Sequence, residues 1–331
     1  MKRFGVWVAA GLAMAASSAF AADKVSFGTN WLAEAEHGGY YQAVADGTYA
    51  KYGLDVTIVQ GGPQANNGLL LATGKLDFYM GGNLLLAFDA VEQGVPIVVV
   101  AADFQKDPQI MMSHPGVGLD NWMDLPKATA FVGKEGLASY YQWMKSAYGF
   151  KEENVKPYTF NPAPFIADKN SIQQGYVTSE PFAVEREGHF KPNIFLFADH
   201  GYGTYATTIE TRADVVAKNP DLVQRFVDAS AIGWYNYLYG DNKKANELIK
   251  KDNPEMTDEQ IAFSIAKIKE YGLVDSGDTL KLGVGAMTDE RIKEFYDSMV
   301  KAGVVKPGID YKKAYTLQFV NKGVGLDLRP K

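Results

Sequence analysis

The sequence predicts an α/β protein, and three observations lead to that prediction. Strand-like segments rich in β-branched residues alternate with helix-like segments along the chain. Residues 97–100, one Ile and three Val, are typical of a strand buried on both faces of a parallel sheet. With 47% hydrophobic and 22% charged residues, the composition excludes a disordered, collagen-like or coiled-coil chain. The length of 331 residues predicts two domains, at about 100–200 residues per domain.

The first third of the chain alternates regularly between the two kinds of segment. Gly81-Gly82 is expected to stop the third strand, and Asn83 to cap the helix that follows. Such an order is typical of mostly parallel strands joined by helices. Expected strands cover residues 24–28, 54–60, 76–80 and 96–101, and expected helices cover residues 38–46, 66–73 and 84–93.

The rest of the chain repeats this pattern and then becomes mainly helical. Asn219-Pro220 is typical of a helix N-terminus, and Thr257 and Thr288 are expected to cap two later helices. No internal repeat or flexible linker is present in the sequence, so we expect the chain to cross between the domains more than once. Expected strands cover residues 128–132, 173–178 and 194–197, with a turn at 133–136 and helices at 137–148 and 220–239.

The first 21 residues are typical of a secretory signal peptide. Lys2 and Arg3 precede an apolar run, and Ala19-Phe20-Ala21 supplies a cleavage pattern. A membrane anchor is the alternative, but the run is shorter than the roughly 20 residues that span a bilayer. No cysteine is present, which excludes lipid attachment at a new N-terminal cysteine. We therefore expect a soluble protein exported to the periplasm.

Composition and motifs exclude several classes of function. The chain has 39 acidic and 33 basic residues and no basic cluster, which argues against nucleic-acid binding. It has no cysteine, so disulfides, zinc–thiolate sites and cysteine nucleophiles are excluded. The four histidines show no metal-binding spacing, and no phosphate loop or Gly-x-Ser-x-Gly elbow is present. Gly201-Tyr-Gly203-Thr-Tyr-Ala206 matches a dinucleotide pattern, but a strand-like segment follows it instead of a helix. These observations predict a binding protein without metal or cofactor, not an enzyme.

Several segments spread over the chain resemble the periplasmic substrate-binding proteins of ABC importers. Within them the sequence is most similar to the thiamine-pyrimidine-precursor binders, with the sulfonate, taurine and nitrate binders as wider relatives. The segments that carry the resemblance are residues 30–43 (with Trp31, His37 and Tyr40), 51–56 (Lys-Tyr-Gly-Leu-Asp-Val), 73–78 (Thr-Gly-Lys-Leu-Asp-Phe), 104–109 (Phe-Gln-Lys-Asp-Pro-Gln), 174–181 (with Glu180-Pro181) and 219–223.

This resemblance implies a two-lobed, type II-like periplasmic binding protein with the ligand in a cleft between the lobes and two hinge crossings. Lobe one is expected at residues 22–107 plus 205–331, and lobe two at residues 108–204. The resemblance also implies a monomer that closes around a small molecule and docks on an ABC permease driven by a separate ATPase subunit. No ATP site is expected in this chain.

The candidate ligand-binding residues follow expected strands in the two lobes. Because parallel strands end at one edge of a sheet, we expect these residues to face the cleft. They are Asn30, Trp31, Glu36, His37, Tyr40, Asn83, Phe104, Tyr140, Glu180, Tyr202 and Tyr205.

Each aromatic candidate has an alternative role in packing. Trp31 supplies either a flat face for a heteroaromatic ligand or a core ring. Tyr40 and Tyr41 lie on different faces of an expected helix, so at most one points into the cleft. Tyr140 and Tyr202 fit the packing of a lobe equally well, and so does Tyr205.

The polar candidates also have alternatives. His37 donates either to a ligand or to a neighbouring carbonyl, and Asn83 is a helix cap first. Glu34 and Glu36 are of a type more often solvated than bound to a ligand. Glu180, before Pro181, is the position favoured for accepting N–H bonds from a ligand.

Residues 32–36 differ from the pyrimidine-precursor binders, which usually carry a stretch with Pro and Asn there. Here the stretch is Leu-Ala-Glu-Ala-Glu, and its carboxylates favour a ligand that is neutral, cationic or rich in N–H donors over nitrate or sulfonate. The sequence thus predicts capture of a small nitrogen heterocycle. An alkanesulfonate, taurine, nitrate or other small metabolite is one alternative, and an exported enzyme on the same fold is another. Fungal enzymes of this fold that make the pyrimidine depend on cysteines, so the resemblance does not extend to their chemistry.

Overall fold

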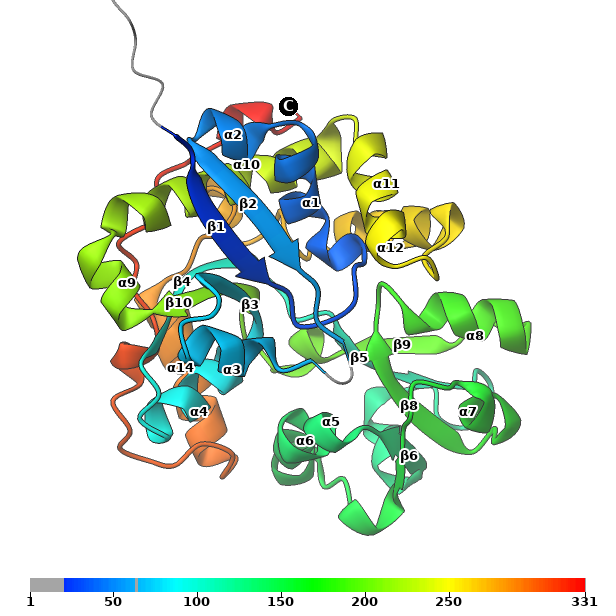
Figure 1. Cartoon of the computed structure of the whole chain (residues 1–331). Coiled ribbons are helices and arrows are strands. Elements are labelled where there is room, and N and C mark those ends of the chain that lie inside the picture. Colours follow the sequence, from blue (N-terminus) through cyan, green and yellow to red (C-terminus); the bar gives the residue numbers. More distant parts are fainter. Residues whose placement is uncertain (1–20, 63–64, 331) are drawn as a thin grey trace, which may run out of the picture.

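The computed structural model describes residues 21–62 and 65–330 and contains two sheets, each of which forms the centre of one lobe (Figure 1). The predicted signal peptide lies almost wholly outside the described residues. In lobe one the strand order is β2 (Leu54–Val59), β1 (Asp23–Gly28), β3 (Phe78–Asn83), β10 (Ala206–Arg212) and β4 (Ile97–Phe104). In lobe two the order is β7 (Val155–Pro157), β6 (Thr129–Val132), β8 (Ser171–Tyr176), β5 (Gln109–Ser113) and β9 (Asn193–Leu196).

One strand in each sheet runs against the others. In lobe one β10 is antiparallel to both β3 and β4, while β1 is parallel to β2 and β3. In lobe two β5 is antiparallel to both β8 and β9, while β6 is parallel to β7 and β8. The reversed strands are the ones that the chain enters on crossing between the lobes. The predicted α/β class, with mostly parallel strands, is confirmed.

The helices lie around these sheets (Figure 1). Lobe one carries α1 (Gly38–Ala45), α2 (Thr48–Lys51), α3 (Asn67–Ala72), α4 (Leu84–Glu92), α9 (Ala213–Lys218), α10 (Pro220–Tyr239), α11 (Lys243–Asp252), α12 (Asp258–Glu270), α13 (Thr279–Leu282) and α14 (Asp289–Lys301). Lobe two carries α5 (Lys134–Ala138), α6 (Tyr140–Tyr148), α7 (Ala163–Ala167) and α8 (Glu180–Gly188). Short 3-10 helices are η1 (Ala35–His37), η2 (Trp122–Lys127), η3 (Glu152–Asn154), η4 (Phe197–His200), η5 (Tyr311–Ala314) and η6 (Leu326–Leu328).

Two sequence-based expectations about elements are wrong. β3 does not stop at Gly81-Gly82 but continues to Asn83, because β10 pairs with it over Thr208 and Gly81. The expected turn at 133–136 is instead the start of α5, which is separated from α6 by a break at Ser139. The predicted caps at Asn83, Thr257 and Thr288 are confirmed, since each side chain accepts a backbone N–H of its helix.

Aromatic rings fill the core of each lobe. In lobe one, Phe226 of α10 stacks on Phe78 and on Tyr49 with ring centroids 4.1 and 5.3 Å apart. In lobe two, Trp122 stacks on His200 at 4.3 Å and meets Trp143 at 6.3 Å. Rings packed at these separations gain a contribution beyond their buried area, so most of the abundant aromatic residues serve packing.

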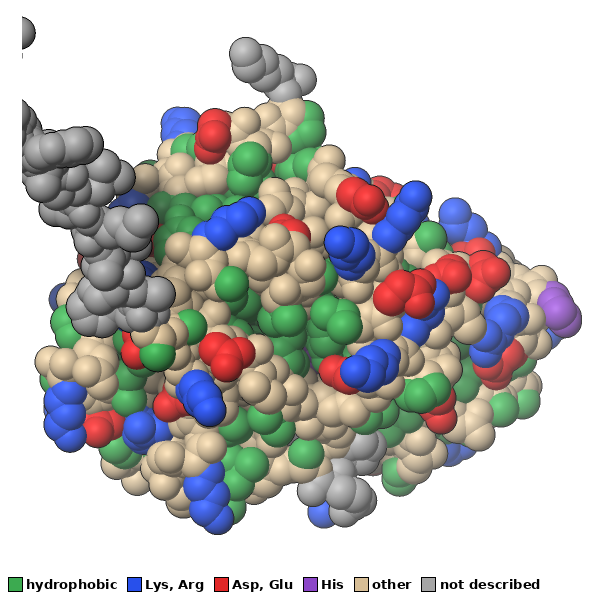
Figure 2. All heavy atoms as spheres, turned by 45° about the horizontal axis from the view of Figure 1, so that its top comes forward, with side chains coloured by type: hydrophobic (Ala, Val, Ile, Leu, Met, Phe, Trp, Pro, Cys, Tyr) green, Lys and Arg blue, Asp and Glu red, His purple; other side chains and the backbone are tan. Residues whose placement is uncertain are grey.

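None of the described helices has the length and apolar character needed to cross a bilayer. On the face drawn in Figure 2, acidic and basic side chains are interspersed, with apolar side chains between them. No stripe of basic residues, as nucleic-acid binding requires, runs across that face.

Candidate ligand-binding site

The candidate site forms where the end of β1 in lobe one meets the end of β8 in lobe two. After β1, residues 29–34 lead into η1, which carries Glu36 and His37. After β8, residues 177–179 lead into α8, which begins at Glu180. The two segments are in contact through α12, because the Ser264 hydroxyl donates to the Thr178 carbonyl at 2.7 Å. The site is therefore shared between the lobes.

Close packing of α1 turns η1 inward. A Cβ atom at Gly38 would lie 2.0 Å from the Tyr237 ring of α10, so only glycine allows this approach. The approach buries the preceding turn. Glu36 is 3% exposed and His37 is 0% exposed, and the Glu34 side chain is 13% exposed. The expectation that the two glutamates lie in solvent is wrong for this reason.

A second close approach orients Glu180. A Cβ atom at Gly175 of β8 would lie 2.7 Å from the Cβ of Glu180, so α8 starts directly against the strand. The Glu180 carboxylate accepts the Tyr176 backbone N–H at 2.7 Å and the Tyr158 hydroxyl at 3.4 Å. Pro181 in the first turn fits here, because that position needs no backbone donor.

Three carboxylates thus lie close enough to interact. Burial, then the charges of Glu36 and Glu180, raise the pKa of Glu34 well above its usual value. Burial raises the pKa of Glu36, which the nearby Thr178 hydroxyl offsets in part. Burial raises the pKa of Glu180 to about 7, although the Tyr176 N–H opposes the rise. Among the described residues, no Lys or Arg forms an ion pair with these carboxylates.

His37 lies beside these carboxylates and carries no charge. Its Nε2 lies 3.7 Å from Glu34 Oε1. Burial lowers the pKa of His37 to about 3, so the ring is neutral at pH 7. A neutral imidazole offers one donor and one acceptor.

The most informative feature of the site is a set of buried polar atoms that lack hydrogen-bond partners within the described chain. Both carboxylate oxygens of Glu36 belong to it, and so do both ring nitrogens of His37. The hydroxyls of Thr178 and Tyr237 belong to it as well; the Thr178 hydroxyl lies near Glu36 and opposes the rise in its pKa that burial causes, but the two do not meet in hydrogen-bonding geometry. The charge of Glu36 also raises the pKa of Tyr237, after burial, which puts the two side chains near each other. Buried polar groups in native proteins are almost always paired, so this group is suited to a ligand that supplies the partners.

A second polar group continues the site along the end of β3. Asn83 donates its side-chain amide to Asp107 at 3.0 Å, and burial raises the pKa of Asp107 to about 6. The Tyr140 hydroxyl donates to Gln174 at 2.7 Å. After burial, the neighbouring Tyr202, Asp107 and Glu180 all raise the pKa of Tyr140, which connects this group to the carboxylates. The Tyr202 hydroxyl is buried, which raises its pKa, and the nearby Asn83 amide opposes this rise in part, but the hydroxyl makes no hydrogen bond of normal geometry among the described residues.

An aromatic pair joins the lobes beside the carboxylates. Trp31 of lobe one meets Phe160 of lobe two with ring centroids 5.1 Å apart, and Phe160 also meets Tyr158 at 5.4 Å. Phe160 is 59% exposed and has a φ of 61°, which is unusual for a residue with a side chain. The contact with the Trp31 ring fixes the direction of this apolar side chain.

The structure brings most of the sequence-predicted residues together and places three elsewhere. Asn30 lies over the end of β3, its amide 4.0 Å from the Cβ position of Gly82. Trp31, Glu36, His37, Asn83, Tyr140, Glu180 and Tyr202 all belong to the groups described above.

The three exceptions are fully buried in other parts of lobe one. Tyr40 donates its hydroxyl to Asp103 at 2.7 Å, and Phe104 packs on Trp234 with centroids 5.4 Å apart. Tyr205 donates to Asp278 at 2.7 Å, near the crossing between the lobes. Their side chains are engaged in the framework of lobe one.

The sequence did not predict four residues of the site, namely Thr178, Tyr158, Phe160 and Tyr237. Tyr158 and Phe160 lie between Pro157 and Pro162, in a segment that the sequence indicates only as irregular. The sequence pattern predicts that Tyr237 is a core position of a long amphipathic helix. For Thr178, the one signal in the sequence was its position just before Glu180-Pro181.

Two cavities of the described structure lie away from this group. A cavity of about 240 Å³ lies behind the crossing at Gly201 and Gly203, next to α14. A second, of about 430 Å³, lies over α2 and α10. At the carboxylates the two lobes are in contact, since Trp31 meets Phe160 and, after burial and the charge of Glu36, the charge of Glu180 raises the pKa of Glu34. Within the described ranges, no group of three or more His, Asp or Glu side chains could hold a metal ion.

The two-sheet architecture with its antiparallel crossing strands defines the class of two-lobed periplasmic-binding-protein folds. The periplasmic aliphatic sulphonate binding protein SsuA from Escherichia coli has this fold, with a TM-score of 0.65, 11% identity, and coverage of 88% of this chain and 91% of that chain. The ligand-binding component of an ABC-type import system from Staphylococcus aureus follows at TM-score 0.62, 14% identity, and coverage of 89% and 97%. The desulfurization enzyme DszB also has the fold, at TM-score 0.55, 11% identity, and coverage of 90% and 97%.

The amino-acid sequence identifies the family to which the chain belongs. Residues 34–245 match the model of the NMT1/THI5-like family, so the chain belongs to that family. A curated relative, the riboflavin-binding protein RibY of Chloroflexus aurantiacus, is 24% identical over 315 residues, which cover 91% of this chain and 87% of the relative.

Proposed function

We propose that this chain captures a small nitrogen heterocycle in the periplasm and delivers it unchanged to the permease of an ABC importer. The observation that carries the proposal is the buried, unpaired carboxylate of Glu36, together with His37 and Thr178. A ligand with N–H donors would satisfy these groups when the lobes close.

The chemistry of the site favours N–H donors over anions. Glu36 and Glu180 can each accept from a ring or amino N–H, and neutral His37 can add one donor and one acceptor. A hydrogen bond to a charged group contributes about 1.5–3 kcal/mol. A sulfonate or nitrate would instead meet three carboxyl groups, and among the described residues no Lys or Arg is paired with them to balance its negative charge. The site thus favours a heterocycle such as an aminopyrimidine over the alkanesulfonate alternative.

The aromatic pair supports a flat ligand. Trp31 and Phe160 present ring faces from opposite lobes beside the carboxylates. A planar heterocycle gains both stacking against such faces and hydrogen bonds at its edge. RibY is named for binding riboflavin, itself a planar nitrogen heterocycle, which supports the same class of ligand.

Lobe closure would provide the transport step. The lobes touch through Trp31 and Phe160 and through Ser264 and Thr178. A ligand that bridges Glu36 and Glu180 would favour the closed arrangement over an open one. The closed form would then present surfaces of both lobes to the permease.

Chemical turnover is the competing function, since DszB is an enzyme on this fold. The described site has a carboxylate group and a neutral histidine but no serine or cysteine held next to that histidine. We therefore propose binding without catalysis.

One experiment tests the proposal. The protein is purified without refolding and examined by native mass spectrometry, and the released ligand is identified. In parallel, thermal-shift assays use the hydroxymethyl aminopyrimidine half of thiamine, riboflavin and ethanesulfonate. We expect stabilisation by a nitrogen heterocycle and its recovery unchanged after overnight incubation. Stabilisation by ethanesulfonate alone, or recovery of a product, would contradict the proposal.

A further inference from the structure

Two segments of chain join the lobes, and lobe one holds its side of both firmly. In residues 105–108, the backbone N–H groups of Gln105 and Lys106 donate to the Leu273 carbonyl at 2.5 and 3.3 Å. In residues 201–205, the Tyr205 hydroxyl donates to Asp278 and accepts the Thr288 N–H at 3.1 Å. Both segments are therefore fixed to the same stretch of lobe one, residues 273–288.

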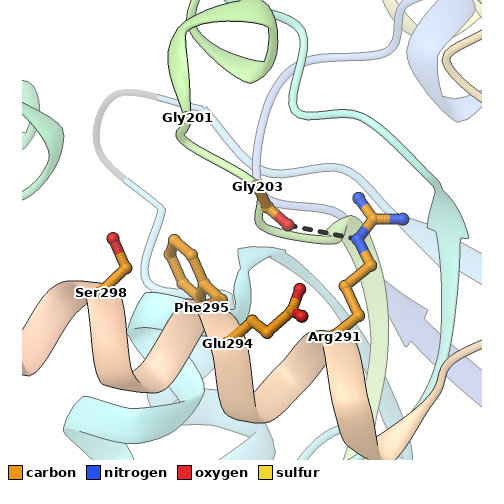
Figure 3. Close-up of a pocket in the computed structure, with 6 residues that line it drawn as sticks. All are labelled: Gly201, Gly203, Arg291, Glu294, Phe295 and Ser298. Carbon is orange, nitrogen blue, oxygen red and sulfur yellow. Dashed lines mark hydrogen bonds between the residues drawn. The ribbon is translucent and has the colours of Figure 1, made fainter.

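One side chain contacts both segments. The guanidinium of Arg291, on α14, donates to the Gly203 carbonyl at 3.2 Å (Figure 3). The same group donates to the Thr204 carbonyl at 3.4 Å. It also donates to the backbone carbonyl and the side-chain oxygen of Gln105. Its plane lies over the Tyr205 ring, 4.1 Å from the centroid. Arg291 thus bridges the two crossings from one helix.

Lobe two holds the other side of each segment. The Pro108 carbonyl accepts the Val177 N–H at 2.9 Å, and the Tyr202 N–H donates to the Phe197 carbonyl at 3.0 Å. In the first crossing the Asp107 backbone lies between the held parts, while its side chain accepts the Asn83 amide of lobe one and the Gln109 N–H of lobe two. In the second crossing the peptide between Tyr202 and Gly203 lies between them. Backbone changes at these two points would let one lobe rotate against the other.

Space is present where the second crossing would move. The cavity of about 240 Å³ lies between this crossing and α14, and it is lined by Gly201, Gly203, Arg291, Glu294, Phe295 and Ser298 (Figure 3). A Cβ atom at Gly203 would meet nothing within 4 Å. The crossing thus has open space at Gly203, while Tyr202 packs edge-on against Phe295 of α14 at 5.3 Å and Arg291 supplies the polar contacts that hold it to this helix.

We propose that Arg291 is the positioning residue of the hinge: it fixes the lobe-one side of both crossings, so that lobe two turns about Asp107 and the 202–203 peptide. A guanidinium suits this role because it stays charged at all relevant pH values and offers five donors in a planar fork. An ammonium has neither the fork nor the flat face that stacks on Tyr205. The inference rests on the lobe closure in the proposed function but on no particular ligand.

The test measures the distance between the lobes in the ligand-free protein. The chain has no cysteine, so spin labels go only where cysteines are introduced. Lys75→Cys and Lys169→Cys, both exposed, place one label in each lobe. Double electron–electron resonance then gives the width of the distance distribution in the unchanged hinge and in Arg291→Met, Arg291→Lys and the control Lys293→Met. Lys293 lies on the same helix but pairs only with Asp297 at the surface.

We expect Arg291→Met to widen the distribution by about twofold or more, Arg291→Lys to give an intermediate width, and Lys293→Met to leave it unchanged. A side chain that only adds stability would change the urea midpoint without changing this width. If Arg291→Met does not fold, the widths of the distance distributions of Arg291→Lys and Tyr205→Leu test the inference instead. Widths equal to that of the unchanged hinge in the folded Arg291 variants would overturn the inference.

The same labels separate this inference from the proposed function. Adding the hydroxymethyl aminopyrimidine to the unchanged hinge tests ligand-driven closure. A failure of that shift contradicts the proposed ligand or closure, whereas the comparison of Arg291 variants without ligand addresses Arg291 alone.

Discussion

Two buried carboxylates in lobe one show how the same side-chain chemistry serves structure in one place and recognition in another. Asp103, at the end of β4, is 1% exposed and accepts the Tyr40 hydroxyl at 2.7 Å and the Trp234 indole N–H at 2.9 Å. Glu36, in η1, is 3% exposed; the fold places only the Thr178 hydroxyl near its carboxylate, and no hydrogen bond of normal geometry forms between them. Burial raises the pKa of both. A buried acid whose donors come from the fold is part of the framework, whereas one whose donors are missing is suited to a ligand.

The largest expected effect is on stability at Asp103. Asp103→Ala should lower the free energy of unfolding by about 2–4 kcal/mol, because it leaves the Tyr40 and Trp234 donors buried without an acceptor. Urea unfolding followed by tryptophan fluorescence measures this change. Glu36→Gln is the matched control and should leave the stability equal or slightly higher. A larger loss for Glu36→Gln than for Asp103→Ala would reverse the comparison.

The next effect concerns ligand affinity at Glu36. Glu36→Gln should weaken binding of the hydroxymethyl aminopyrimidine by about 10- to 100-fold, since the amide replaces one acceptor oxygen with an NH2 donor that opposes the ligand N–H. Isothermal titration calorimetry gives the affinity, and the surface change Glu247→Gln serves as the control. Unchanged affinity in Glu36→Gln would remove Glu36 from the ligand site.

The pH dependence of ligand affinity tests the role of another buried carboxyl group, that of Glu180. Its pKa of about 7 means that the carboxyl is largely protonated at pH 6 and largely ionised at pH 8. A proton therefore competes with an N–H donor, and affinity should rise by up to about tenfold from pH 6 to pH 8. Glu180→Gln should flatten this part of the profile. Glu34, Glu36, His37, Tyr158 and Tyr176 face the same group, so the difference between the two profiles, and not the raw slope, is the quantity to compare. A profile that falls with pH would contradict the N–H donor hypothesis.

The smallest expected effect belongs to the aromatic pair. Phe160→Ala should raise the ligand dissociation rate about two- to five-fold, because one ring contact between the lobes is lost while the carboxylates remain. Stopped-flow measurement of the tryptophan fluorescence of the protein follows the rate. Met123→Ala removes another exposed apolar side chain of lobe two and should have no effect. Equal rates in the two variants would assign Phe160 to the surface.

The sequence predicted the order of elements and several caps because these depend on local patterns. Asn83 and Thr257 cap their helices as expected, and Glu180 begins a helix beside the other acids. The burial of Glu36 was not predictable, because it depends on α10 packing against Gly38, about 200 residues away in the chain. Phe160 was missed for the same reason, since only the contact with Trp31 gives this loop residue a role.

The positions of the lobe boundaries stay a prediction at 107/108 and 204/205. The two crossings in the structure cover these positions, at residues 105–108 and 201–205. Sequence patterns locate strands well but carry no direct signal for a hinge, which is defined by contacts made from α14 and from residues 273–288.

A crystal structure of the protein with the hydroxymethyl aminopyrimidine bound tests the central claim most directly. We predict the ligand between the lobes, with an N–H group within about 3 Å of a Glu36 carboxylate oxygen. A ligand bound elsewhere, with both Glu36 oxygens still unpaired or paired only with water, would contradict the account.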